Sequence, residues 1–115
     1  MNFDYLDPGL QISVVPVRDG VARVNVRGEL DVATSPSLQR CLDGELTAGR
    51  GVELDLSGVP FIDSSGIRVL LIELGSFAEQ GRDFTVCTPL RDQVRRVLEL
   101  TGVLERLPVA PSGGG

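Results

Sequence analysis

Residues 61–71, FIDSSGIRVLL, change their hydrophobic pattern halfway along. Upstream, residues 52–56 alternate apolar and polar side chains, which is typical of a β-strand with one buried face. Downstream of the DSSG motif, apolar residues recur three, four and seven positions apart, which predicts an amphipathic helix. Small polar residues and a glycine separate the two patterns. We therefore expect a strand-to-helix junction at residues 63–66 that presents a hydroxyl group to solvent.

Two runs near the N-terminus predict an antiparallel hairpin. Residues 10–18 and 21–27 both have alternating segments, and the turn-forming pair Asp19-Gly20 separates them. Pro16 lacks the N–H group that a central strand needs, so we expect the first run to be an edge strand. Further along, the patterns predict three helices: one that begins at Thr34-Ser35-Pro36 and closes by Gly49, one that follows the DSSG motif and stops at Gly81, and one between Thr88-Pro89 and Gly102. They also predict a strand over residues 84–87 and a short apolar segment or last strand over residues 103–109.

Strands that alternate with helices indicate crossover connections and a partly parallel sheet. We expect an α/β fold in which helices pack against a mixed β-sheet of four to five strands with an N-terminal hairpin. The chain has 115 residues, which suits one domain with one core. We therefore expect a single domain over residues 1–115, with its core at about residues 10–107 and a flexible tail at residues 110–115.

Charge and composition exclude several functions. Sixteen acidic residues against eleven basic ones give a net charge of −5, which argues against a nucleic-acid partner. All of the basic residues are arginines, and histidine is absent. The commonest general base is therefore missing, and no Ser-His-Asp or Cys-His arrangement can form within the chain. The remaining Asp, Glu and Ser residues show no paired catalytic arrangement, so we expect a protein that is not an enzyme.

The two cysteines, Cys41 and Cys87, predict neither a redox motif nor a metal site. They are too far apart for a C-x-x-C motif, and two cysteines without histidine do not complete a tetrahedral zinc site. We expect reduced, buried thiols, and we expect no metal and no cofactor. No apolar run approaches the roughly 20 residues that span a bilayer, and the N-terminus lacks a signal-peptide pattern. A soluble, cytoplasmic protein without a membrane partner is expected.

The DSSG motif suits the start of a helix. The side chain of Asp63 or Ser64 can accept hydrogen bonds from free N–H groups in the first helical turn. Gly66 has no side chain, so another backbone segment or a partner can approach closely there. A helix cap alone would also explain the motif. Considered by themselves, these residues leave a structural and a functional interpretation open.

Three motifs together resemble the anti-sigma factor antagonists of the STAS domain family. They are GELD at residues 28–31, FIDSSGI at residues 61–67 and LELTGV at residues 98–103. Their order and spacing extend the resemblance over nearly the whole chain. The resemblance implies that the serine after the aspartate is phosphorylated by a kinase that is itself the anti-sigma factor. The matching position is Ser64, and Ser65 is the second choice.

The resemblance also implies a partner-switching cycle. The unmodified protein would bind the anti-sigma factor and free the sigma factor, phosphorylation would break this complex, and a separate serine phosphatase would restore it. The loop at residues 28–35 follows a strand and precedes a helix, so we expect it at the same edge of the sheet as the motif. The residues expected to contact the partner are Asp31, Glu29, Asp63, Ser65, Gly66 and Arg68. For Asp31 the alternative is a turn residue, and for Arg68 it is a solvent-facing cation.

Two other classes of protein share some of these features. Asp55 ends a strand as a receiver-domain aspartate would, but a receiver also needs a lysine near its end, and the chain has none. A STAS domain can instead be a fixed, never phosphorylated subunit of a larger regulatory or transport assembly. Such a subunit would have the same fold and the same helix cap. This alternative therefore stays open at the level of sequence.

Overall fold

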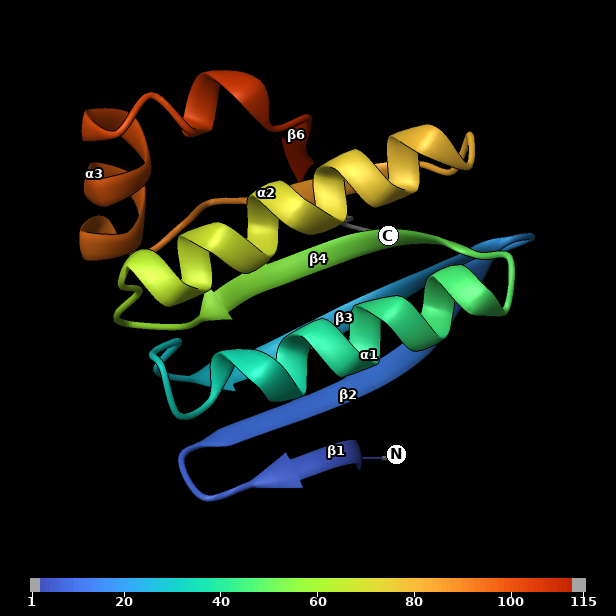
Figure 1. Ribbon diagram of the computed structural model, residues 1–115, viewed down its shortest axis with the longest axis horizontal. Coiled ribbons are helices and arrows are strands. Elements are labelled where there is room, and N and C mark those ends of the chain that lie inside the picture. Colours follow the sequence, from blue (N-terminus) through green and yellow to red (C-terminus); the bar gives the residue numbers. More distant parts are fainter. Residues whose placement is uncertain (1–2, 113–115) are drawn as a thin grey trace.

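The computed structural model describes the backbone of residues 3–112 and the side chains of residues 8–112. Helices and strands alternate after an N-terminal run of three strands (Figure 1). The elements are β1 (Phe3–Asp7), β2 (Leu10–Arg18), β3 (Val21–Gly28), α1 (Ser35–Thr47), β4 (Gly51–Gly58), α2 (Ser64–Glu79), β5 (Phe84–Thr88), α3 (Asp92–Leu100), the 3-10 helix η1 (Leu104–Arg106) and β6 (Val109–Pro111).

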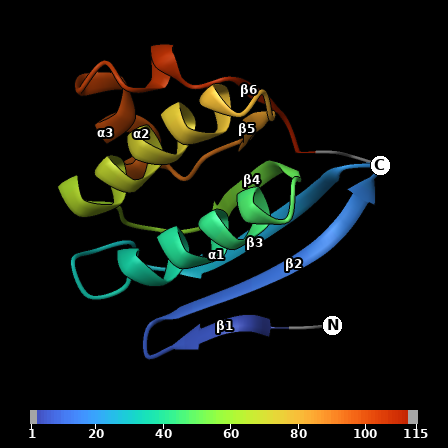
Figure 2. The same ribbon diagram turned by 45° about the vertical axis from the view of Figure 1, so that its right-hand side comes forward.

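All six strands belong to one mixed sheet in the order β1-β2-β3-β4-β5-β6. The strands β1, β2 and β3 pair antiparallel, and the pairs from β3 to β6 are parallel. Helices α1 and α2 lie side by side across one face of the sheet, while α3 lies beyond the start of α2 (Figures 1 and 2). This arrangement brings the ends of β3 and β4 and the starts of α1 and α2 to one edge.

The core lies between the sheet and the two long helices. Alternate side chains of the central strands, such as Val24 and Leu54, are fully buried there. The stripe of α2 contributes Leu70 and Phe77, which are also fully buried. Both cysteines are buried thiols, as predicted, and neither belongs to a disulfide within the described residues.

The predicted fold class is confirmed, and the sheet has a strand that the sequence did not reveal. Strand β1 contains two aspartates in five residues, a composition that strands disfavour. It forms because its backbone pairs with β2, so β2 is an interior strand over its first part and the edge-strand prediction was wrong there. Pro16 lies beyond the part of β2 that pairs with β1, where β3 is the paired neighbour.

The C-terminal third also differs from the predicted boundaries. Helix α3 begins at Asp92 rather than at Thr88-Pro89, because Thr88 continues β5 and Arg91 is still extended. The apolar segment at residues 103–109 forms η1 and then enters β6. Residues 110 and 111, expected in a flexible tail, belong to β6, and residues 113–115 of that tail lie outside the described residues.

Candidate functional site

The DSSG motif forms the start of α2. Asp63 is the N-cap, with extended backbone, and its Oδ1 accepts hydrogen bonds from the N–H groups of Ser65 at 2.8 Å and Gly66 at 3.4 Å. The cap therefore comes from Asp63 and not from Ser64. Ser64 is the first helical residue and is exposed, whereas Ser65 is half-buried. The hydroxyl group predicted at the junction thus lies on the surface.

A backbone bridge joins the two loops that frame this junction. The N–H group of Leu30 donates to the carbonyl oxygen of Phe61 at 2.9 Å, and that of Asp63 donates to the carbonyl oxygen of Leu30 at 3.0 Å. Together they form an isolated parallel bridge between Leu30 and Ile62. The loop before α1 therefore lies next to the DSSG motif, as the sequence predicted.

Gly66 is necessary for this close packing. It is buried, and a Cβ atom added there would lie 2.6 Å from Cγ1 of Ile62 and 3.0 Å from Cβ of Leu30. Both distances are shorter than ordinary carbon contacts. The absence of a side chain lets the first turn of α2 rest directly on the bridged loops.

Asp31 shapes the loop before α1. Its Oδ1 accepts hydrogen bonds from the N–H groups of Ala33 and Thr34, each at 3.0 Å, and the hydroxyl group of Thr34 donates to the carbonyl oxygen of Glu29 at 2.6 Å. This network is the turn role that the sequence had left as an alternative. Glu29 itself is exposed, and contact of either residue with a partner stays a prediction.

Gln93 of α3 also binds the junction, in a role that the sequence did not predict. Its side-chain oxygen accepts a hydrogen bond from the N–H group of Ile62 at 3.0 Å, and its Nε2 donates to the carbonyl oxygen of Ile62 at 3.2 Å. The two residues are 31 positions apart, and a single glutamine in a helix carries no signal of such a contact. The junction at the start of α2 is thus bonded to the loop before α1 and to α3.

A groove lies between the N-terminal halves of α1 and α2. We call this hollow of about 300 Å³ the helix groove. It includes two of the predicted contact residues, Ser65 and Arg68, and two exposed apolar ones that were not predicted, Val32 and Ile72. Val32 lies in the Asp31 turn and is 75% exposed, and Ile72 lies beside the buried stripe of α2. The hydrophobic pattern of the sequence therefore did not identify either residue as part of an exposed groove. The lining residues are Val32, Ser35, Pro36, Gln39, Ser65, Arg68, Val69 and Ile72.

One carboxyl group is buried where α2 faces α1. Glu73 is fully buried, and its two side-chain oxygens have no hydrogen-bond partner among the described residues. Burial, and after it the neighbouring side chain of Asp43, together raise the pKa of this carboxyl group to about 8, while Gln39 acts in the opposite direction. At neutral pH the Glu73 side chain is therefore mostly protonated.

Within residues 3–112, no helix combines the length and apolar character needed to cross a membrane. Among the side chains of residues 8–112, no group of three or more Cys, Asp or Glu could hold a metal ion.

Comparisons with known proteins point to one family. Residues 13–113 match the family model of the STAS domain. BtrV of Bordetella bronchiseptica, whose name describes it as an anti-sigma factor antagonist, is 32% identical over 95 residues, which are 82% of this chain and 81% of BtrV. A solved anti-sigma factor antagonist from Mycobacterium paratuberculosis has a TM-score of 0.75 at 25% identity, covering 94% of this chain and 91% of that chain. The anti-sigma factor antagonist SpoIIAA in its unphosphorylated form is similar in fold, with a TM-score of 0.73 at 17% identity over 88% of this chain and 89% of that chain.

Proposed function

The chain belongs to the STAS domain family, and on this premise we propose that it is an anti-sigma factor antagonist. In its unphosphorylated form it binds an anti-sigma factor that is also a serine kinase, and thereby frees a sigma factor in the cytoplasm. Phosphorylation of Ser64 by that kinase ends the complex, and a separate serine phosphatase restores the binding form. The role is regulatory rather than catalytic.

The exposure of Ser64 is the observation that carries this proposal. A kinase needs a hydroxyl group that it can reach, and Ser64 is exposed at the first position of α2. The neighbouring Asp63 caps the helix with its own side chain, so the Ser64 hydroxyl group is not needed for the cap. Ser65 lines the helix groove and is half-buried, which favours Ser64 as the acceptor.

Phosphorylation at this position changes the surface more than the fold. A phosphate adds a charge of about −1.5 to −2. The free N–H groups and the dipole at a helix N-terminus favour an anion, so the domain tolerates the group. A dianion beside the carboxylate of Asp63 would, however, have to lose its water when a partner covers the site. Docking is therefore weakened while the core stays intact.

The helix groove supplies the partner surface next to Ser64. Val32 and Ile72 offer apolar area, and Arg68 offers a cation on the same groove. A partner that inserts an apolar side chain and presents an acidic group would complement this groove. Asp31 supports the surface indirectly, because its turn holds the loop that displays Val32.

The proposal is tested with the kinase that co-purifies with the unmodified protein. Wild type, Ser64→Ala and Ser65→Ala are each incubated with this kinase and ATP, and intact mass is measured. We expect one phosphate on wild type and on Ser65→Ala, and none on Ser64→Ala. Phosphate on Ser64→Ala but not on Ser65→Ala would move the site to Ser65. A stable complex in which none of the three proteins is modified would favour the alternative, a fixed STAS subunit of a larger assembly.

A further inference from the structure

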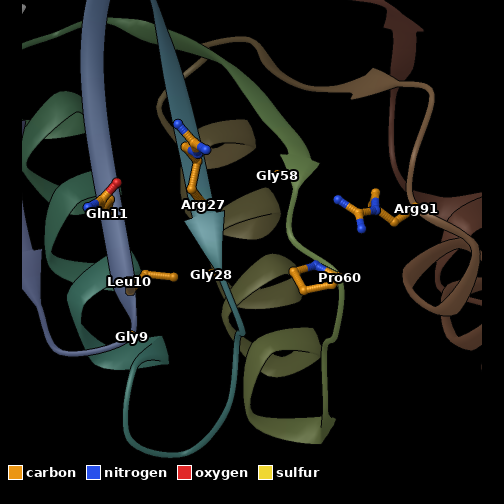
Figure 3. Close-up of a pocket in the computed structure, with 8 residues that line it drawn as sticks. All are labelled: Gly9, Leu10, Gln11, Arg27, Gly28, Gly58, Pro60 and Arg91. Atoms are coloured by element: carbon orange, nitrogen blue, oxygen red, sulfur yellow. The ribbon is translucent and has the colours of Figure 1, made fainter.

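A second hollow lies behind the loops that frame Ser64. It has a volume of about 460 Å³ and shares no lining residue with the helix groove. Its residues come from the start of β2 and the turn before it, from the end of β3, from the end of β4 and the segment after it, and from the segment before α3 (Figure 3). They are Gly9, Leu10, Gln11, Arg27, Gly28, Gly58, Pro60 and Arg91. We call this hollow the arginine pocket.

Two exposed arginines, Arg27 and Arg91, line the arginine pocket. Arg27 and Arg91 stand on either side of the segment that contains Gly58 and Pro60 (Figure 3). Among the side chains of residues 8–112, neither arginine forms an ion pair, a property that both share with Arg40, Arg68, Arg82, Arg96 and Arg106. The eight lining residues include no carboxylate. In a chain of net charge −5, this concentration of positive charge marks a local exception.

Two glycines allow the chain segments around this pocket to pack closely together. Gly28 has a φ of +116°, and a Cβ atom there would lie 2.0 Å from the carbonyl oxygen of Gly9. A Cβ atom on Gly58 would lie 2.8 Å from Cγ of Arg27. Larger residues at these two positions would collide with backbone or with the Arg27 stem. The close approach of the three chain segments around the hollow therefore requires glycine at positions 28 and 58.

We propose that the arginine pocket binds a small molecule that carries a phosphate group. A guanidinium group is a planar fork of N–H donors that matches phosphate oxygens, and two of them face this pocket. Leu10 and Pro60 add apolar surface for the organic part of an ester, and Gln11 adds a polar side chain. The volume lies within the roughly 300–1,000 Å³ of small-molecule sites.

The position of the pocket connects this ligand to the Ser64 junction. Gly28 leads into the loop that bridges to Ile62, Pro60 leads directly into the DSSG motif, and Arg91 leads into the helix of Gln93. A bound phosphate would draw these segments together from the side opposite the helix groove. Regulation of partner binding by the ligand rests on the proposed function, whereas the binding itself does not.

Binding is tested on the full chain without any partner. Amide resonances are followed by two-dimensional NMR while inorganic phosphate or glycerol 3-phosphate is added at constant ionic strength. We expect saturable shifts centred on Gly28, Gly58 and Arg91 with both probes. Tighter binding of the ester would identify an organic phosphate as the ligand, and equal binding would identify the phosphate group alone as sufficient.

Three variants decide whether the arginine pocket is the site. Arg27→Gln and Arg91→Gln should each weaken binding about tenfold or more, because each removes a charged donor. Arg106→Gln makes the same change in net charge on η1, away from the pocket, and should leave the affinity unchanged. The same spectra show whether each variant is folded. Shifts that never saturate, or an affinity that Arg27→Gln and Arg91→Gln both leave unchanged, would overturn the proposal. Such a failure would leave the Ser64 phosphorylation test untouched.

Discussion

The buried carboxyl group of Glu73 should make the stability of this protein fall as pH rises. The pKa of Glu73 is about 8 in the folded protein, whereas an unfolded glutamate has a pKa of about 4.3. Between these values the folded chain holds a proton that the unfolded chain has lost. The contribution of Glu73 to stability is therefore greatest below the unfolded pKa, and it decreases until the folded carboxyl group also ionises near pH 8.

The size of the effect follows from this window. Each pH unit within it changes the free energy of unfolding by about 1.4 kcal/mol. From about pH 5 to about pH 8 the loss attributable to Glu73 is about 3–4 kcal/mol, which is less than three full steps because the folded carboxyl group is already half ionised near pH 8. Domains of this size have total stabilities of about 5–15 kcal/mol, so the loss is readily measured.

Glu73→Gln removes the ionisable carboxyl group but keeps the shape of the side chain. A buried amide with poor partners carries a cost of about 1–3 kcal/mol, but that cost does not depend on pH. The difference between wild type and Glu73→Gln in the free energy of unfolding should therefore change by about 3–4 kcal/mol across this pH range. Urea denaturation at several pH values measures it.

A matched control is available on the same helix. Glu79 ends α2 and is exposed, so Glu79→Gln should follow the wild-type pH profile. Parallel profiles for wild type and Glu73→Gln would refute the reasoning, because they would mean that the Glu73 carboxyl group ionises alike in the folded and unfolded chains.

Three further predictions concern the junction. Gly66→Ala should destabilise the protein by about 1–3 kcal/mol in urea denaturation, because its Cβ atom would collide with Ile62. Gly75→Ala is the control: its Cβ atom would meet no atom within 4 Å, so it should stabilise the helix by about 0.5–1 kcal/mol. Gln93→Ala should speed hydrogen exchange at the Ile62 amide and cost about 1–3 kcal/mol, and an unchanged exchange rate would mean that the two hydrogen bonds are not maintained in solution. Phosphorylation of Ser64 should change thermal stability by no more than about 1 kcal/mol while it abolishes binding in a pull-down, and a loss of several kcal/mol would show that the switch acts by unfolding.

Much of the fold follows from local patterns in the sequence. Apolar alternation placed β3 and β4, and helical spacing placed α1 and α2, because each pattern reflects which side of one element faces the core. A cap at Asp63 or Ser64 was predicted from the local sequence, and the structure assigns it to Asp63, whose carboxylate accepts from N–H groups two and three residues away. The exposed hydroxyl group of Ser64 follows from its place at the helix start.

Contacts between distant parts of the chain decided the rest. Strand β1 forms only because β2 offers it a backbone edge, and α3 starts late because β5 extends through Thr88 to pair with β6. The bridge at Leu30, the Gln93 clamp and the two hollows all join residues that have no shared periodicity. A sequence pattern shows on which face of its own element a residue lies, but not which distant segment packs against that face. The burial of Glu73 against α1 and the presence of Arg27 and Arg91 around one hollow depend on how whole elements pack, and only the tertiary structure decides that.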